Sequence, residues 1–189
     1  MIRVCLDLNV WCAELLATRK GLADTACQLL VVVARRGACS LGPTQLVVSW
    51  GMLTRVRKVL ETDWRVPRTV VDPYLAAIVG YARLGPARTA PLVPLGGTGV
   101  MPIRDPEDAH VLDTAIAGSA DFLVTANFDD FLTYRSRELS PKRIAVLPHP
   151  AGQLVVAHPF QMAEWVRTGR VTLPKPTPSG STRRRRRSR

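Results

Sequence analysis

The chain has 189 residues, a hydrophobic content of 47% and a formal net charge of +11. This length suits one domain with a buried core, and the mean hydropathy of +0.06 is typical of a soluble globular protein. No apolar run approaches the roughly 18 residues of a membrane span, and Asp7 interrupts the N-terminal apolar segment, unlike in a signal peptide. We therefore expect a cytoplasmic protein without a membrane partner.

Hydrophobic periodicity predicts strands that alternate with helices. In chain order, the pattern predicts a strand at 2–6, helices at 8–17 and 23–36, a strand at 46–49, helices at 50–61 and 68–83 and a surface loop at 85–99. A strand at 100–103 follows, then a helix that begins at Asp105 and Pro106, runs to about 117 and ends at Gly118. The last predicted elements are strands at 121–125 and 144–147 and a closing helix at 159–167. This alternation indicates an α/β sandwich around a mainly parallel sheet.

The C-terminal segment is dominated by proline, serine, glycine and arginine, which predicts a domain over 1–167 and a disordered basic tail over 168–189. Six arginines lie within residues 181–189, and without them the formal net charge is +5 (11 − 6). A basic surface favours RNA or DNA as a partner. The equal alternative is that the charge only keeps the protein soluble. The candidate electrostatic tether for RNA, with a solvated tail as its alternative, consists of Arg183, Arg184, Arg185, Arg186 and Arg187.

Polar and mostly acidic residues follow three of the predicted strands. Asp7 ends the first, Asp105 and Asp108 follow the strand at 100–103, and Asn127 and Asp130 follow the strand at 121–125. Because the carboxyl ends of parallel strands meet at one edge of a sheet, we expect these residues to converge there. Oxygen ligands of this kind suit Mg²⁺ or Mn²⁺, which can activate water and neutralise charge on a phosphodiester.

Each of these acids has a structural alternative. Asp105 is a candidate N-cap, Asp108 a support for the same helix start, and Asp130 a plain loop residue. For Asp7 a functional role is favoured, because burying a carboxylate at the end of an apolar strand costs free energy unless the carboxylate is paired or coordinated. Structural or surface roles are predicted for the remaining polar residues: an exposed helix position for Asp113, a turn at the opposite sheet edge for Asp121, and scattered positions for His110, His149 and His158.

Several motifs together resemble PIN domains. Residues 4–10 resemble the opening strand of that family, which delivers an aspartate followed by one residue and asparagine. Residues 105–112 resemble its third acidic motif, residues 121–127 with 130–131 its fourth, and residues 158–160 the run into its last helix. The matching motifs span about residues 1–167. Their order and spacing are similar to those of VapC-like toxin nucleases of bacterial toxin–antitoxin pairs.

The resemblance implies a PIN-like three-layer α/β/α sandwich and a Mg²⁺- or Mn²⁺-dependent endoribonuclease, often a homodimer held inactive by a small antitoxin. Asp7 and Asp108 would carry the metal, and Asp130 would join them in catalysis. The supporting residues would be Asn9, Asp105, Thr125 and Asn127.

Two positions depart from the family pattern. Arg55 stands in the middle helix where the family usually has glutamate, and Asn127 stands where many members have aspartate. Glu61 is six residues from Arg55 and therefore lies elsewhere around the helix. Fewer negative ligands weaken cation binding. Either the site works with one weakly held metal, or Arg55 points elsewhere, or the protein binds RNA without cutting it.

Overall fold

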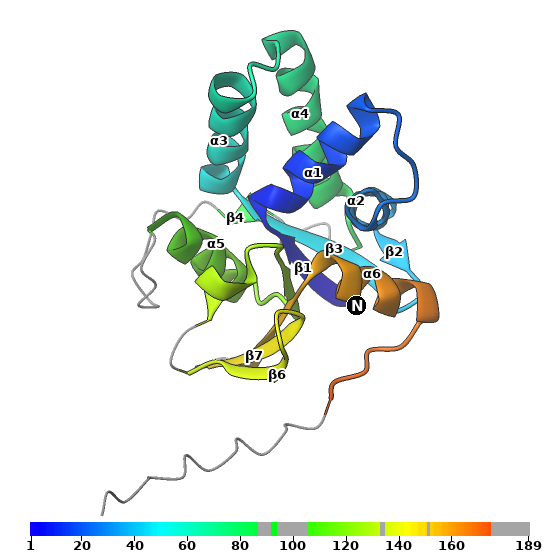
Figure 1. Ribbon diagram of the computed structural model, residues 1–189, viewed down its shortest axis with the longest axis vertical. Coiled ribbons are helices and arrows are strands. Elements are labelled where there is room, and N and C mark those ends of the chain that lie inside the picture. Colours follow the sequence, from blue (N-terminus) through cyan, green and yellow to red (C-terminus); the bar gives the residue numbers. More distant parts are fainter. Residues whose placement is uncertain (87–91, 94–105, 133–134, 151, 175–189) are drawn as a thin grey trace, which may run out of the picture.

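The computed structural model describes residues 1–86, 92–93, 106–132, 135–150 and 152–174. Within these residues, eight strands form one mixed sheet and six α-helices pack around it (Figure 1). The helices are α1 Leu8–Arg19, α2 Ala26–Arg36, α3 Trp50–Lys58, α4 Arg68–Leu84, α5 Pro106–Ala117 and α6 Pro159–Thr168. This is the predicted α/β sandwich.

The sheet has the strand order β2-β3-β1-β5-β8-β7-β6, with β4 also paired to β3. Its centre, β3-β1-β5-β8, is parallel, whereas β2, β7 and β6 add antiparallel pairs at the two edges. The strands are β1 Ile2–Leu6, β2 Ala38–Cys39, β3 Gly42–Ser49, β4 Leu92–Val93, β5 Phe122–Val124, β6 Arg137–Ser140, β7 Ile144–His149 and β8 Gly152–Ala157.

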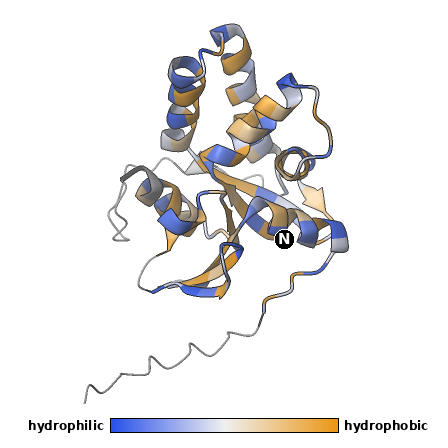
Figure 2. Cartoon of the chain, viewed as in Figure 1, coloured by the Kyte–Doolittle hydropathy of each residue, from blue (hydrophilic) through white to orange (hydrophobic). Residues whose placement is uncertain are grey.

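Helices cover both faces of the sheet. Phe122 of β5 contacts Trp165 of α6, with ring centroids 5.8 Å apart. The residue after Phe122 points to the opposite face, in register with Cys5 and Val47. Val47 lies against Gly118 at the end of α5, so α5 and α6 lie on opposite sides. The central strands are largely hydrophobic, whereas the helices carry both classes of residue (Figure 2), as this layering requires.

Local signals in the sequence set several helix boundaries. α2 begins at Ala26, three residues later than predicted, because Thr25 and Gln28 form a reciprocal capping box. It ends as predicted at Gly37, whose φ of 65° is in the left-handed region that glycine tolerates. Ser49 caps α3 by accepting a hydrogen bond from Met52 N.

The predicted strands were incomplete, because β2, β4, β6 and β8 were not among them. The strand at 144–147 is not the last one, because β8 follows β7 and pairs with both β7 and β5. The predicted surface loop at 85–99 contains β4, which pairs with the end of β3. β2 and β4 have only two residues each. The predicted strand at 100–103 and the basic tail from 175 onward lie outside the described residues.

Helix α3 is shorter than predicted, because it passes at Val59 into a π-helical turn, Val59–Asp63. No helix in the described ranges is both long and apolar enough to cross a membrane.

The packing of α5 on β3 can be tested with two glycines. We expect Gly118→Ala to lower the free energy of unfolding by about 1–3 kcal/mol, because its Cβ would lie 2.2 Å from Val47 Cγ1. Gly80→Ala, within α4 and with no atom within 4 Å of the added Cβ, should be neutral or stabilising. Chemical denaturation measures both, and equal effects would contradict this packing.

Candidate functional site

Four polar residues lie at the carboxyl ends of the parallel strands. Ser49 ends β3, Asp7 follows β1, Thr125 follows β5 and His158 follows β8. Because these strands are neighbours in the order β3-β1-β5-β8, the four residues lie side by side along one edge of the sheet. The backbone continues the ladder here, since Asp7 N donates to the carbonyl of Val124, the last residue of β5.

Asp7 is the buried acid of this edge, with 4% of its surface exposed. Its Oδ1 accepts a hydrogen bond from Leu8 N (2.6 Å), which also caps α1. Its Oδ2 accepts from Asn9 Nδ2 (2.6 Å) and from Thr125 Oγ1 (2.7 Å). One carboxylate therefore ties together β1, the start of α1 and the end of β5.

Asn9 and Thr125 extend this network into the loop after β5. Ala126 N donates to Asn9 Oδ1 (3.0 Å), and Asn127 N donates to Thr125 Oγ1 (2.9 Å). Asn9 Nδ2 also lies 3.1 Å from Thr125 Oγ1. The structure thus brings Asp7, Asn9 and Thr125 together and fixes the loop that carries Asn127.

Burial raises the pKa of Asp7 above the ordinary aspartate value of 3.8. The hydrogen bonds from Thr125, Leu8 and Asn9 oppose this rise in pKa, whereas the negative charge of Asp130 adds to it. Asp130 is exposed and lies in the 3-10 helix Phe128–Phe131, next to Asp129, which pairs with Lys142 at 3.3 Å. Asp130 is therefore the acid from this loop that acts electrostatically on Asp7.

Helix α5 reaches the same edge through a second polar network. Thr114 Oγ1 donates to Ser49 Oγ (3.0 Å), and His110 Nε2 lies 3.2 Å from the same oxygen. The ring of His110 packs over Gly51, where an added Cβ would lie 1.9 Å from Nε2. The sequence did not single out Ser49 as a residue of this edge. Gly51, two residues after Ser49, is the local signal of this close approach, because a larger residue there would meet the ring of His110.

The N-terminal part of α5 carries the acids that the third motif predicts. Asp108 is two residues before His110 on α5, although its side chain lies outside the described part of the structure, as does all of Asp105. Asp113 was predicted to be exposed and is instead 3% exposed. That prediction was wrong because the tertiary packing of α5 buries this position. The arginines at 183–187 also lie outside the described residues.

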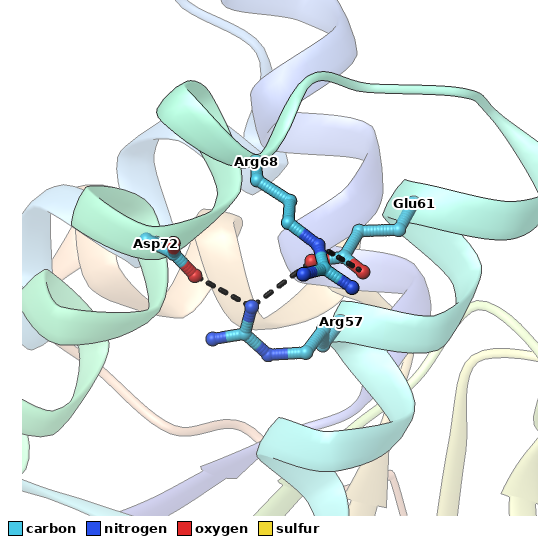
Figure 3. Close-up of polar contacts among 4 residues, drawn as sticks. All are labelled: Arg57, Glu61, Arg68 and Asp72. Carbon is cyan, nitrogen blue, oxygen red and sulfur yellow. Dashed lines mark hydrogen bonds and ion pairs between the residues drawn. The ribbon is translucent and has the colours of Figure 1, made fainter.

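Glu61 does not belong to this edge. It is in the π-helical turn and pairs with Arg57 (2.9 Å) and Arg68 (3.4 Å), while Arg57 also bonds Asp72 on α4 at 2.5 Å (Figure 3). This network joins the α3 segment to α4, so Glu61 serves packing between helices. Arg55 lies on α3 and is half-buried.

The described part of the edge offers a carboxylate oxygen that could bind a hard cation. Among the described residues, Oδ1 of Asp7 accepts one hydrogen bond, from Leu8 N, and a carboxylate oxygen has a second lone pair that could bind a metal. The carboxylates of Asp7 and Asp130 repel each other, and a cation would relieve that repulsion. In the described residues, no group of three His, Cys, Asp or Glu side chains is arranged to hold a metal. Further acidic ligands would have to come from the beginning of α5.

The parallel sheet and the polar residues at its carboxyl edge define an α/β protein with a carboxylate-centred candidate site. Residues 3–129 match a family model described as PIN domain, and the chain therefore belongs to the PIN domain family, whose fold is of nuclease type. A comparison with curated proteins gives no match.

The burial of Asp7 predicts a pH dependence of stability. Its folded-state pKa is raised, so the folded state binds the proton more tightly, and the contribution of Asp7 to stability falls as pH rises from about 3.8 through the folded pKa. Measured by chemical denaturation in EDTA, the wild type should lose stability relative to Asp7→Asn over this interval. A constant difference between the two proteins across the interval would contradict the raised pKa.

Proposed function

We propose that this protein is a metal-dependent endoribonuclease of the PIN type. The observation that carries the proposal is the buried, hydrogen-bonded carboxylate of Asp7 at the carboxyl edge of the sheet, close to the charge of Asp130. A buried carboxylate that keeps a free lone pair is costly unless a cation approaches it. Membership of the PIN family supports hydrolysis of phosphodiester bonds as the reaction.

Each of the candidate residues would have its own role in this reaction. Asp7 and Asp108 would hold Mg²⁺ or Mn²⁺, and Asp130 would act beside them. When bound, the cation would supply charge neutralisation and activation of water. Asn9 and Thr125 would hold the carboxylate of Asp7 in one orientation, because each donates to its Oδ2. Asp105 and Asn127 would support the site from the two flanking loops.

The proposal includes a biological setting. The order and spacing of the acidic motifs support a toxin of a type II toxin–antitoxin pair, with RNA as substrate, a small antitoxin protein as partner and a homodimer as the assembly. The formal net charge of +11 supports binding of a polyanion.

One alternative is a PIN-fold protein that binds nucleic acid without cutting it. Arg55 and Asn127 favour it, because the family usually has glutamate and often aspartate at these positions. A guanidinium near the site would compete with a metal for the carboxylates. The two functions differ in whether divalent cations produce cleavage.

Incubation of the purified protein with RNA separates the two functions. With Mn²⁺ we expect cleavage that EDTA abolishes and that Asp7→Asn and Asp108→Asn lower at least about 100-fold, a loss typical of removing one electrostatic catalytic group. Product formation is followed by gel electrophoresis.

Asp24→Asn is the matched control, since Asp24 is exposed in the turn between α1 and α2, and its φ of 59° suits asparagine. It should cleave like the wild type. Equal residual signal from the wild type and Asp108→Asn would show contamination and remove the nuclease proposal.

Arg55 can be tested directly by Arg55→Glu. If Arg55 borders the metal-binding pocket, this change replaces a positive charge with a ligand, and Mn²⁺ should bind at least several-fold more tightly. Isothermal titration calorimetry measures the affinity. Arg36→Glu is the control of equal charge change, because Arg36 is exposed at the end of α2. Equal effects of both variants would mean that only overall charge matters.

A further inference from the structure

A pocket of about 410 Å³ lies beside the Asp7 network, over the carboxyl ends of β5 and β8. Its lining residues come from the loop after β5, from the β6–β7 turn and from the start of α6: Ala126, Asn127, Asp129, Lys142, Arg143 and Phe160, together with Phe128 and His158. Ala126 and Asn127 are also the residues whose backbone N–H groups bond Asn9 and Thr125. The pocket is therefore directly continuous with the candidate site.

The pocket is built around an aromatic side chain with a cation beside it. Phe160 is 61% exposed. The ring of His158 stacks on it, with centroids 5.3 Å apart and an angle of 25° between the planes. The guanidinium carbon of Arg143 lies 6.0 Å from the centroid of Phe160.

The geometry fixes both partners of Phe160. His158 Nδ1 accepts a hydrogen bond from Phe160 N at the start of α6. His158 N donates to the carbonyl oxygen of Arg143, which ties the β6–β7 turn to the same helix start. Burial, and then the charge of Arg143, lower the pKa of His158. Phe160 thus projects from a fixed base, which limits the entropy that it would lose on binding a ligand.

We propose that this pocket is a nucleotide subsite, in which an unpaired base of single-stranded RNA stacks on Phe160 and a neighbouring phosphate contacts Arg143 and Lys142. The inference rests on the proposed function for the identity of its ligand. Aromatic platforms flanked by basic side chains bind single strands in this way, and a base inside a duplex is not available for such stacking.

The place of the pocket along the sheet supports this ligand. His158 follows β8 and Asp7 follows β1, with β5 between them, so the pocket lies about two strand spacings, or about 10 Å, from the carboxylate of Asp7. An RNA strand that crosses the edge of the sheet would reach both. Of the large hydrophobic side chains that are exposed in the described residues, Phe160 is the one that lines this pocket. A helical protein partner would need a wider apolar surface.

The test measures binding of a short, fluorescein-labelled single-stranded RNA by fluorescence anisotropy in EDTA, where metal-dependent cleavage does not occur. Phe160→Ala and Phe160→Leu should weaken binding roughly ten-fold, as expected for the loss of one base stack. Phe160→Tyr, which keeps an aromatic face, should bind like the wild type. Trp64→Ala removes a partly exposed aromatic side chain that does not line this pocket and should change nothing.

Inorganic polyphosphate, which has charge but no bases, serves as a second probe. It should bind the wild type and Phe160→Ala equally, whereas Arg143→Ala should weaken its binding. Circular dichroism and the melting temperature verify that the variants fold, which the exposure of Phe160 favours.

Unchanged RNA binding by Phe160→Ala, tight binding by Phe160→Leu or no RNA binding by the wild type would each overturn the subsite. These results are distinct from failure of the proposed function. RNA binding that depends on Phe160, without cleavage in Mn²⁺, would leave the subsite standing and remove the nuclease. Normal cleavage in Mn²⁺ together with unchanged RNA binding by Phe160→Ala would support the nuclease and remove the subsite.

Discussion

The carboxylate of Asp7 is the interaction on which the candidate site depends. It caps α1 through Leu8 N and holds the side chains of Asn9 and Thr125 on its other oxygen. A carboxylate that is 4% exposed loses most of its hydration, and neutral hydrogen-bond donors restore only part of that free energy. The same residue therefore connects β1, α1 and β5 through its hydrogen bonds.

The site is assembled from two halves that meet at the edge of the sheet. One half is the network of Asp7 and Thr125 over β1 and β5. The other is the contact of α5 with the end of β3, where Ser49 bonds Thr114 and lies beside His110. Ser49 thus ties the middle of α5 to the end of β3. Buried polar contacts therefore hold both Asp7 and α5 at this edge of the sheet.

Much of the fold could be predicted because its signals are local. The strand at Ile2–Leu6 and the helix stops at Gly37 and Gly118 follow from hydrophobic pattern and glycine chemistry within a few residues. β2 and β4 could not be found in this way, since each has only two residues and forms a strand only by pairing with β3. Asp113 was misjudged because the burial of a helix position is decided by tertiary packing.

For the site, the sequence by itself determined which acids follow which strands, and parallel topology then required those loops to share an edge. Only the tertiary structure decided how they are linked. It gave Asp7 its hydrogen bond from Thr125, 118 residues away in sequence, and it placed Glu61 in an ion-pair network with Arg57 and Arg68. It also brought Phe160, His158 and Arg143 together beside the loop of Asn127. Such contacts depend on side-chain packing between distant segments, which no local pattern encodes.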